Sequence, residues 1–147
     1  MKDNKTKRNS KKNKLVIDKY SQPIYVPNDL YVIKNYKLED LTKVFKWADG
    51  EEILESEVAE CEGTTCFQWV RKDDKDKNYV TVILLNTLDS AFHKTESEVI
   101  NLLAHEASHA SFRILNYCGI NLNDSTTETF SFVTGWITEC CYKTWKK

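Results

Sequence analysis

The 147-residue sequence has no run of eighteen apolar residues, the length at which a membrane-spanning helix becomes a candidate. It also lacks the apolar segment that follows the basic start of a secretory signal peptide. An odd number of cysteines does not suit a framework of disulfide bonds: Cys61, Cys66, Cys118, Cys140 and Cys141. These absences exclude a transmembrane protein and predict a cytoplasmic one with reduced thiols.

No internal repeat or low-complexity stretch appears beyond residue 14. Residues 1–14 hold seven Lys or Arg and one Asp, whereas the remainder holds fourteen basic and twenty-one acidic residues. We therefore expect a disordered basic tail over 1–14 and a single domain over 15–147. The tail is either a solvated segment, which we favour, or an arm that contacts nucleic acid. The acidic body argues against a large nucleic-acid surface on the domain.

Two of only three histidines stand in the run His105-Glu106-Ala107-Ser108-His109. Histidines four positions apart lie on the same face of a helix, one turn from each other, and can bind one Zn²⁺. The carboxylate of Glu106 can then reach the water on the metal rather than the metal itself. The run is the HExxH motif of zinc proteases, and the alternative is a pair of histidines at chance spacing.

The residues around the motif predict a helix over about 96–117. Thr95 and Glu98 have the spacing of a capping box at its start, and Gly119 follows its end. Apolar residues recur at helical spacing within it: Val99, Leu102, Leu103, Ala107, Ala110 and Ile114. Both motif histidines should therefore lie well inside one helix.

A catalytic zinc needs a third protein ligand, and Glu128 is our candidate. It lies nineteen residues after His109, where a second helix can return beside the first and antiparallel to it. Glu128 also has another explanation, because Ser125 and Glu128 have the spacing of a capping box. Asp124 is the next choice as ligand, whereas Glu139 lies three helical turns beyond Glu128 and is too far away.

The spacing of His105, Glu106, His109 and Glu128 resembles the gluzincin arrangement of thermolysin-like metallopeptidases. Residues 128–137 also look like small zincin-like proteins of phages and prophages, which implies the host cytoplasm as location. The resemblance covers mainly residues 95–140. It implies zinc as cofactor, three metal ligands (His105, His109 and Glu128) and a general base (Glu106).

The chain departs from two zincin patterns. Phe112 and Leu115 stand where the metzincin motif has glycine and histidine, and the only methionine is Met1, so a Met-turn is excluded. The chain is also too short for the second helical domain of large gluzincins, which supplies further donors to the transition state.

We expect zinc-dependent hydrolysis of a peptide bond in a peptide or protein substrate. Zinc lowers the pKa of its bound water toward about 7, and Glu106 takes the proton as general base. A second donor to the developing oxyanion is useful, and His93, Tyr117 and Tyr142 are candidates that no motif positions.

Two alternatives stay open. The chain can be a non-catalytic zincin-like binding or assembly protein. It can also be a deformylase-like amide hydrolase, since peptide deformylases resemble it in having a cysteine ligand upstream of HExxH, here Cys66. The glycine-rich deformylase signature is missing.

The remaining pattern predicts an α+β, zincin-like fold, with a small mixed or antiparallel sheet packed on the HExxH helix and a second C-terminal helix. Gly135, in the last helix, predicts a close approach to Ala107 and Ala110. A sheet edge beside the motif helix could bind an extended peptide by strand addition. The expected strands cover 14–20, 30–33, 64–70 and 79–85, and the expected helices beside the motif helix cover 38–47 and 126–144.

Overall fold

The computed structural model describes residues 14–22, 28–58, 62–86 and 94–147. All of the basic tail except Lys14 lies outside these ranges, as do Cys61 and His93. No helix in the described ranges is long and apolar enough to cross a membrane.

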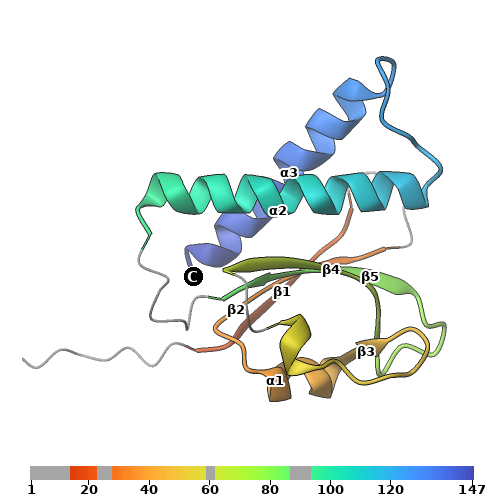
Figure 1. Cartoon of the computed structure of the whole chain (residues 1–147), viewed down its shortest axis with the longest axis vertical. Coiled ribbons are helices and arrows are strands. Elements are labelled where there is room, and N and C mark those ends of the chain that lie inside the picture. The colour runs from red at the N-terminus through yellow and green to blue at the C-terminus, as the bar shows by residue number, and fades with distance from the viewer. Residues whose placement is uncertain (1–13, 23–27, 59–61, 87–93) are drawn as a thin grey trace, which may run out of the picture.

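The described residues form a mixed α+β fold built on one five-stranded sheet (Figure 1). The strand order is β1-β2-β5-β4-β3, and β2 pairs parallel with β5 while every other pair is antiparallel. The α+β class, the mixed sheet and the two C-terminal helices agree with what the sequence predicts. The strands are β1 (Val16–Tyr20), β2 (Leu30–Lys34), β3 (Phe45–Trp47), β4 (Gly63–Arg71) and β5 (Tyr79–Leu85).

Strand β5 lies at the centre of the sheet, as its sequence predicts. Its residues Val80 to Leu85 are all buried, because helices cover one face of the sheet and the segment around β3 covers the other. A strand that is covered on both faces needs apolar side chains in both directions, and this explains why β5 does not alternate.

Helices α2 (Glu96–Tyr117) and α3 (Thr127–Trp145) cover one face of the sheet. The capping box at Thr95 and Glu98 forms as expected, with the Glu98 amide donating to Thr95 Oγ1 over 3.4 Å. The helix ends where Gly119 adopts a φ of 77°, a conformation that glycine reaches without strain. The motif helix therefore has the predicted bounds.

The second core lies on the opposite face of the sheet and includes α1 (Leu38–Val44) and the short 3₁₀ helix η1 (Glu55–Glu57). The sequence predicts one helix over 38–47, but the structure ends it at Val44 and continues as β3. Phe45 and Trp47 pack on Trp69 of β4, with ring centroids 5.9 and 6.2 Å apart. Strand pairing and these aromatic contacts outweigh helical periodicity here.

Helix α3 returns from the end of α2 and crosses it (Figure 1), rather than running antiparallel alongside it as expected. Its C-terminal end is fixed to the sheet by polar contacts. Thr144 donates to Asp18 over 2.7 Å, and the buried Lys34 donates to the carbonyl of Trp145 over 2.8 Å. Burial alone would raise the pKa of Asp18, but hydrogen bonds from Lys147 and Thr144 outweigh it and lower that pKa.

The predicted close approach at Gly135 is wrong. A Cβ atom built on Gly135 meets no atom within 4 Å, and the residue is exposed. The two helices cross nearer to Ser111 and Thr134, whose hydroxyls lie 2.8 Å apart.

Open space at Gly135 leads to a stability prediction. Gly135→Ala should stabilise the protein by about 1 kcal/mol, because alanine loses less backbone freedom in a helix and here meets nothing. Urea unfolding followed by circular dichroism measures the change. Gly119→Ala is the matched control, since its positive φ should make the same substitution destabilising.

Candidate metal and acid–base site

The two motif histidines lie side by side on the exposed face of α2. Their Nε2 atoms are 3.1 Å apart, and their rings are nearly perpendicular at 78° with centroids separated by 4.7 Å. Helical spacing explains the pairing, because positions four apart differ by only about 40° around the axis. Without a metal, one ring nitrogen can donate a hydrogen bond to the other.

This separation fits a shared zinc ion. Two nitrogens at roughly 2.0–2.1 Å from one zinc, at the tetrahedral angle, are about 3.3 Å apart. The observed 3.1 Å is close to that value. The pair can therefore serve as two of the three protein ligands that a catalytic zinc needs.

Glu106 points in another direction, toward β4. Its side chain is only 5% exposed, and Oε2 accepts a hydrogen bond from Thr65 Oγ1 over 2.6 Å. The Thr65 hydroxyl also lies 3.1 Å from the Glu106 carbonyl oxygen. Gly63 makes room for this arrangement, since a Cβ there would lie 3.0 Å from Glu106 Cγ and 3.1 Å from Leu102 Cδ1. Strand β4 therefore fixes the conformation of the carboxylate.

Residues 63–67 of β4 form a sheet edge that no other described strand covers. Strand β3 pairs only with Trp69 to Arg71, and the Ala48 amide extends this pairing to the carbonyl of Gln68. Within the described ranges no strand pairs with 63–67 on the side away from β5. A bulge between Cys66 and Trp69, with Gln68 at a φ of 62°, marks the point where the covered part begins. Bulges of this kind often lie at strand edges near functional sites.

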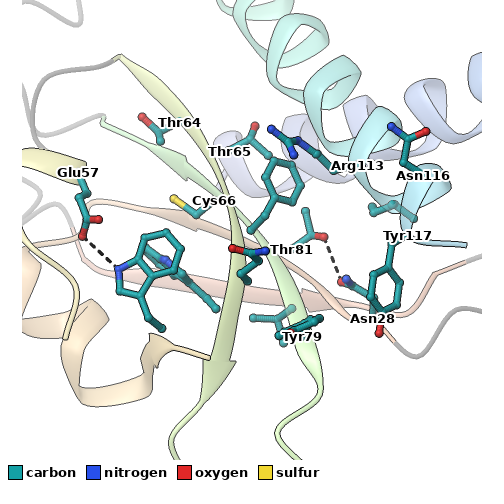
Figure 2. A pocket seen from close by; sticks show the side chains of 16 residues that line it. Asn28, Glu57, Thr64, Thr65, Cys66, Tyr79, Thr81, Arg113, Asn116 and Tyr117 are labelled. Carbon is teal, nitrogen blue, oxygen red and sulfur yellow. Dashed lines mark hydrogen bonds between the residues drawn. The ribbon is translucent and has the colours of Figure 1, made fainter. Parts of the chain in front are cut away.

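A pocket of about 640 Å³ lies along residues 64–69 of β4 and extends to Tyr79 and Thr81 of β5, whereas His105, Glu106 and His109 do not line it. Figure 2 shows Arg113, Asn116 and Tyr117 of α2 on one side of β4, and Cys66 and Glu57 on the other. Side chains from both faces of one strand can line the same pocket only where no neighbouring strand covers its edge. The free edge is therefore accessible from solvent.

The structure does not bring Glu128 to the histidine pair. Glu128 is exposed in the first turn of α3, two residues before Phe130, whose ring packs against Phe112 at 6.1 Å between centroids. Two residues correspond to about 200° of rotation, so Glu128 lies on the side of α3 away from that contact. Asp124 is exposed in the preceding turn. In the described part of the chain, no group of three His, Cys, Asp or Glu residues could hold a metal ion.

The alternative explanation of Glu128 as a capping residue is wrong. The N-cap of α3 is Thr126 and not Ser125, and no side chain caps the helix. The Thr126 hydroxyl is used in the turn, where it donates to the Asn121 carbonyl over 2.7 Å. Glu128 is thus free of the structural role that competed with metal binding.

The expected oxyanion donors are dispersed. The Tyr117 ring stacks edge-on against Tyr79 in the pocket, at 5.9 Å between centroids. Tyr142 donates a hydrogen bond to Glu96 over 2.6 Å. Glu96 is the first residue of α2 and lies nine residues before His105. His93 lies outside the described residues. Of the two candidates that the structure describes, only Tyr117 therefore lines the pocket beside β4.

Cys66, the ligand required by the deformylase-like alternative, is buried on the sheet face opposite α2. Burial raises the pKa of its thiol to about 12. Zinc binds the thiolate, so this thiol is poorly suited as a ligand in its present position. The four described cysteines are all unpaired.

Sequence reasoning missed Thr65, whose hydroxyl holds the carboxylate of Glu106. On the expectation from the HExxH motif that the chain hydrolyses peptides, Thr65→Val should lower kcat about tenfold with little change in KM, because the buried carboxylate loses its hydrogen bond and its orientation. Steady-state kinetics on a peptide substrate measure both constants. Thr65→Ser should restore kcat, and Thr64→Val, on the opposite face of β4, is the control; equal losses in all three would contradict a positioning role.

Comparison with protein-family models, with curated proteins and with solved structures found no match for this chain.

Proposed function

We propose that the chain is a zinc-dependent hydrolase of zincin-like fold that cleaves a peptide bond in a peptide or protein substrate. One observation carries the proposal: two histidine nitrogens stand 3.1 Å apart, close to the separation of two ligands on one zinc, and the residue next to His105 in the sequence is a buried carboxylate. Chance spacing of two histidines does not account for the adjacent buried acid, which is costly to desolvate. The proposed location is the cytoplasm, in agreement with the unpaired cysteines.

His105 and His109 are assigned as zinc ligands through Nε2. Glu128 stays the residue that the sequence predicts as third ligand. To reach the metal, the Glu128 side chain would have to lie on the side of α3 that faces the histidines. When bound, zinc supplies Lewis acidity and activates water at neutral pH. Glu106 is assigned as general base: Thr65 holds Oε2, and Oε1 would have to turn toward the histidine side of α2 to take the proton of the attacking water and pass it to the leaving nitrogen.

The free edge of β4 is the proposed peptide-binding element. An extended peptide can pair with the unpaired backbone groups of 63–67, and pairing places its backbone beside Thr65, the strand residue that contacts Glu106. Peptides that are methylated on alternate backbone nitrogens should bind more weakly, since they lose donors to the strand.

The test uses the full chain purified without added chelator. Elemental analysis should find close to one zinc per chain, and a mixture of synthetic peptides should be cleaved at internal bonds, as mass spectrometry detects. Removal of zinc with a chelator should stop cleavage, and added zinc should restore it. Cleavage that survives complete removal of metal would contradict the proposal.

The second candidate function is a non-catalytic zincin-like binding protein. It is favoured by one observation: the described residues bring only two ligands together. Such a protein should bind peptides along the β4 edge and show neither stoichiometric zinc nor turnover. The metal analysis above separates the two functions.

A further inference from the structure

Arg113 is the positive charge of the pocket beside the β4 edge. It lies seven residues after Glu106 on α2, so both residues face nearly the same side of the helix. Figure 2 shows its side chain reaching toward β4, where the guanidinium carbon lies 5.3 Å from the centre of the Phe67 ring. Stacking on an aromatic ring orients the guanidinium and leaves its N–H groups available.

No carboxylate of the described residues pairs with Arg113. Every ion pair of the described chain involves other residues, and Glu57, the acidic residue that lines this pocket, lies on the opposite side of β4. There the Glu57 carboxylate already accepts hydrogen bonds from Trp47 Nε1 and the Leu54 amide. Arg113 is therefore an oriented cation that faces the pocket and has no counter-charge among the residues that the structure describes.

We propose that Arg113 selects substrates that carry an acidic side chain near the cleaved bond. The inference rests on the proposed peptide substrate and names its class: extended peptides with Glu or Asp at one position. A carboxylate matches the planar donor geometry of a guanidinium, and the resulting hydrogen bonds are charge-assisted.

The position of the acidic residue follows from the spacing. Glu106 and Arg113 are separated by about 10 Å along α2, at 1.5 Å per residue. An extended peptide covers that distance in about three residues, at 3.3 Å each. Because the arginine side chain can reach along the strand, we expect the acidic residue about two or three positions from the cleaved bond.

The direction of the peptide follows from the strand. Strand β4 contacts Glu106 through Thr65 and Arg113 through Phe67, so β4 and α2 run the same way along the pocket. Both strand neighbours of β4 are antiparallel to it. A peptide that pairs antiparallel to β4, as these two strands do, runs from Arg113 toward Glu106. Its acidic residue then lies on the N-terminal side of the cleaved bond.

The experiment measures binding apart from turnover. Decapeptides of Ser, Thr and Val carry a neutral fluorophore and either one Glu or, in the matched peptide, one Gln at the same position. Fluorescence anisotropy with the zinc-free full chain gives their affinities. Glu peptides should bind about tenfold more tightly than Gln peptides at low salt, and the ratio should shrink as salt screens the charges.

Variants assign the preference to Arg113. Arg113→Gln should reduce the Glu to Gln ratio to about one, and Arg113→Lys should keep part of it. Lys143→Gln removes an equal charge from the outer side of α3 and should leave the ratio unchanged. Equal affinities for Glu and Gln peptides, a ratio that survives Arg113→Gln, or no binding of any peptide would each overturn the inference.

Cleavage with zinc present is recorded separately on the same peptides. An Arg113-dependent preference in binding without any cleavage would contradict the proposed hydrolase and leave the acidic preference standing. Cleavage without a preference for Glu would support the proposed hydrolase and contradict the acidic preference.

Discussion

Glu106→Gln should abolish hydrolysis while zinc remains bound. Glutamine keeps the size of the side chain and an oxygen for the Thr65 hydroxyl, but it cannot accept the proton of the attacking water. General base catalysis contributes about 10²–10⁴ in rate, so kcat should fall by that factor. Peptide cleavage is measured beside zinc content, which should match the wild type because Glu106 is not assigned as a ligand.

The same variant should not lose stability, and this separates a functional carboxylate from a structural one. Glu106 is 5% exposed, and in the described residues only the hydroxyl of Thr65 donates a hydrogen bond to its carboxylate. A buried carboxyl group with a single described donor is poorly compensated for its lost hydration, so an amide of the same size should leave the free energy of unfolding equal or raise it by about 1 kcal/mol.

Glu139→Gln is the matched control for both measurements. Glu139 is exposed on α3 and pairs with Lys143 at the surface, where such a pair contributes little. This variant should behave like the wild type in turnover and unfolding. Glu106→Gln protein that retains more than about a tenth of wild-type turnover, with full zinc, would contradict the assignment of the general base.

Local signals predicted the elements that depend on local physics. Helix α2 has the expected bounds because a capping box at Thr95, helical apolar spacing and a terminal glycine all agree. The pairing of His105 with His109 was predictable for the same reason, since it depends only on helical geometry. The central position of β5 followed from its unbroken apolar run.

Long-range contacts account for what the sequence did not reveal. Strand β3 exists because Phe45 and Trp47 meet Trp69, which is more than twenty residues away. Thr65 contacts Glu106 across forty-one positions, and nothing near Thr65 in the sequence signals that contact. The crossing of α3 over α2 likewise depends on tertiary packing, and it determines on which side Glu128 lies.

His105→Ala and His109→Ala should each weaken zinc binding by at least about a hundredfold. Loss of a residue that only supports a ligand costs 10–100-fold in affinity, and loss of a ligand itself should cost more. Competition with a coloured chelator measures the affinity. Ser108→Ala is the control, because Ser108 lies between the histidines and is exposed, and among the described residues its hydroxyl donates only to the Ala104 carbonyl, over 2.8 Å.

Thermal unfolding gives an independent readout of the same prediction. A ligand at a hundred times its Kd stabilises the native state by about 2.7 kcal/mol, so zinc should raise the Tm of wild-type protein and not that of either histidine variant. Without metal the histidine pair offers only an exposed hydrogen bond, and its loss should change stability by less than about 0.5 kcal/mol. A wild-type Tm that does not respond to zinc would contradict the metal site.

Glu128→Ala, measured in the same series, decides the third ligand. A loss of zinc affinity as large as that of His105→Ala would assign Glu128 to the metal, and it would require the first turns of α3 to rotate toward the histidines on binding. An unchanged affinity would exclude Glu128. Because Glu128 is exposed and does not cap α3, its replacement should cost the metal-free protein less than about 1 kcal/mol, from the lost interaction of an acid with the helix N-terminus, so a large loss of affinity reports ligation and not unfolding.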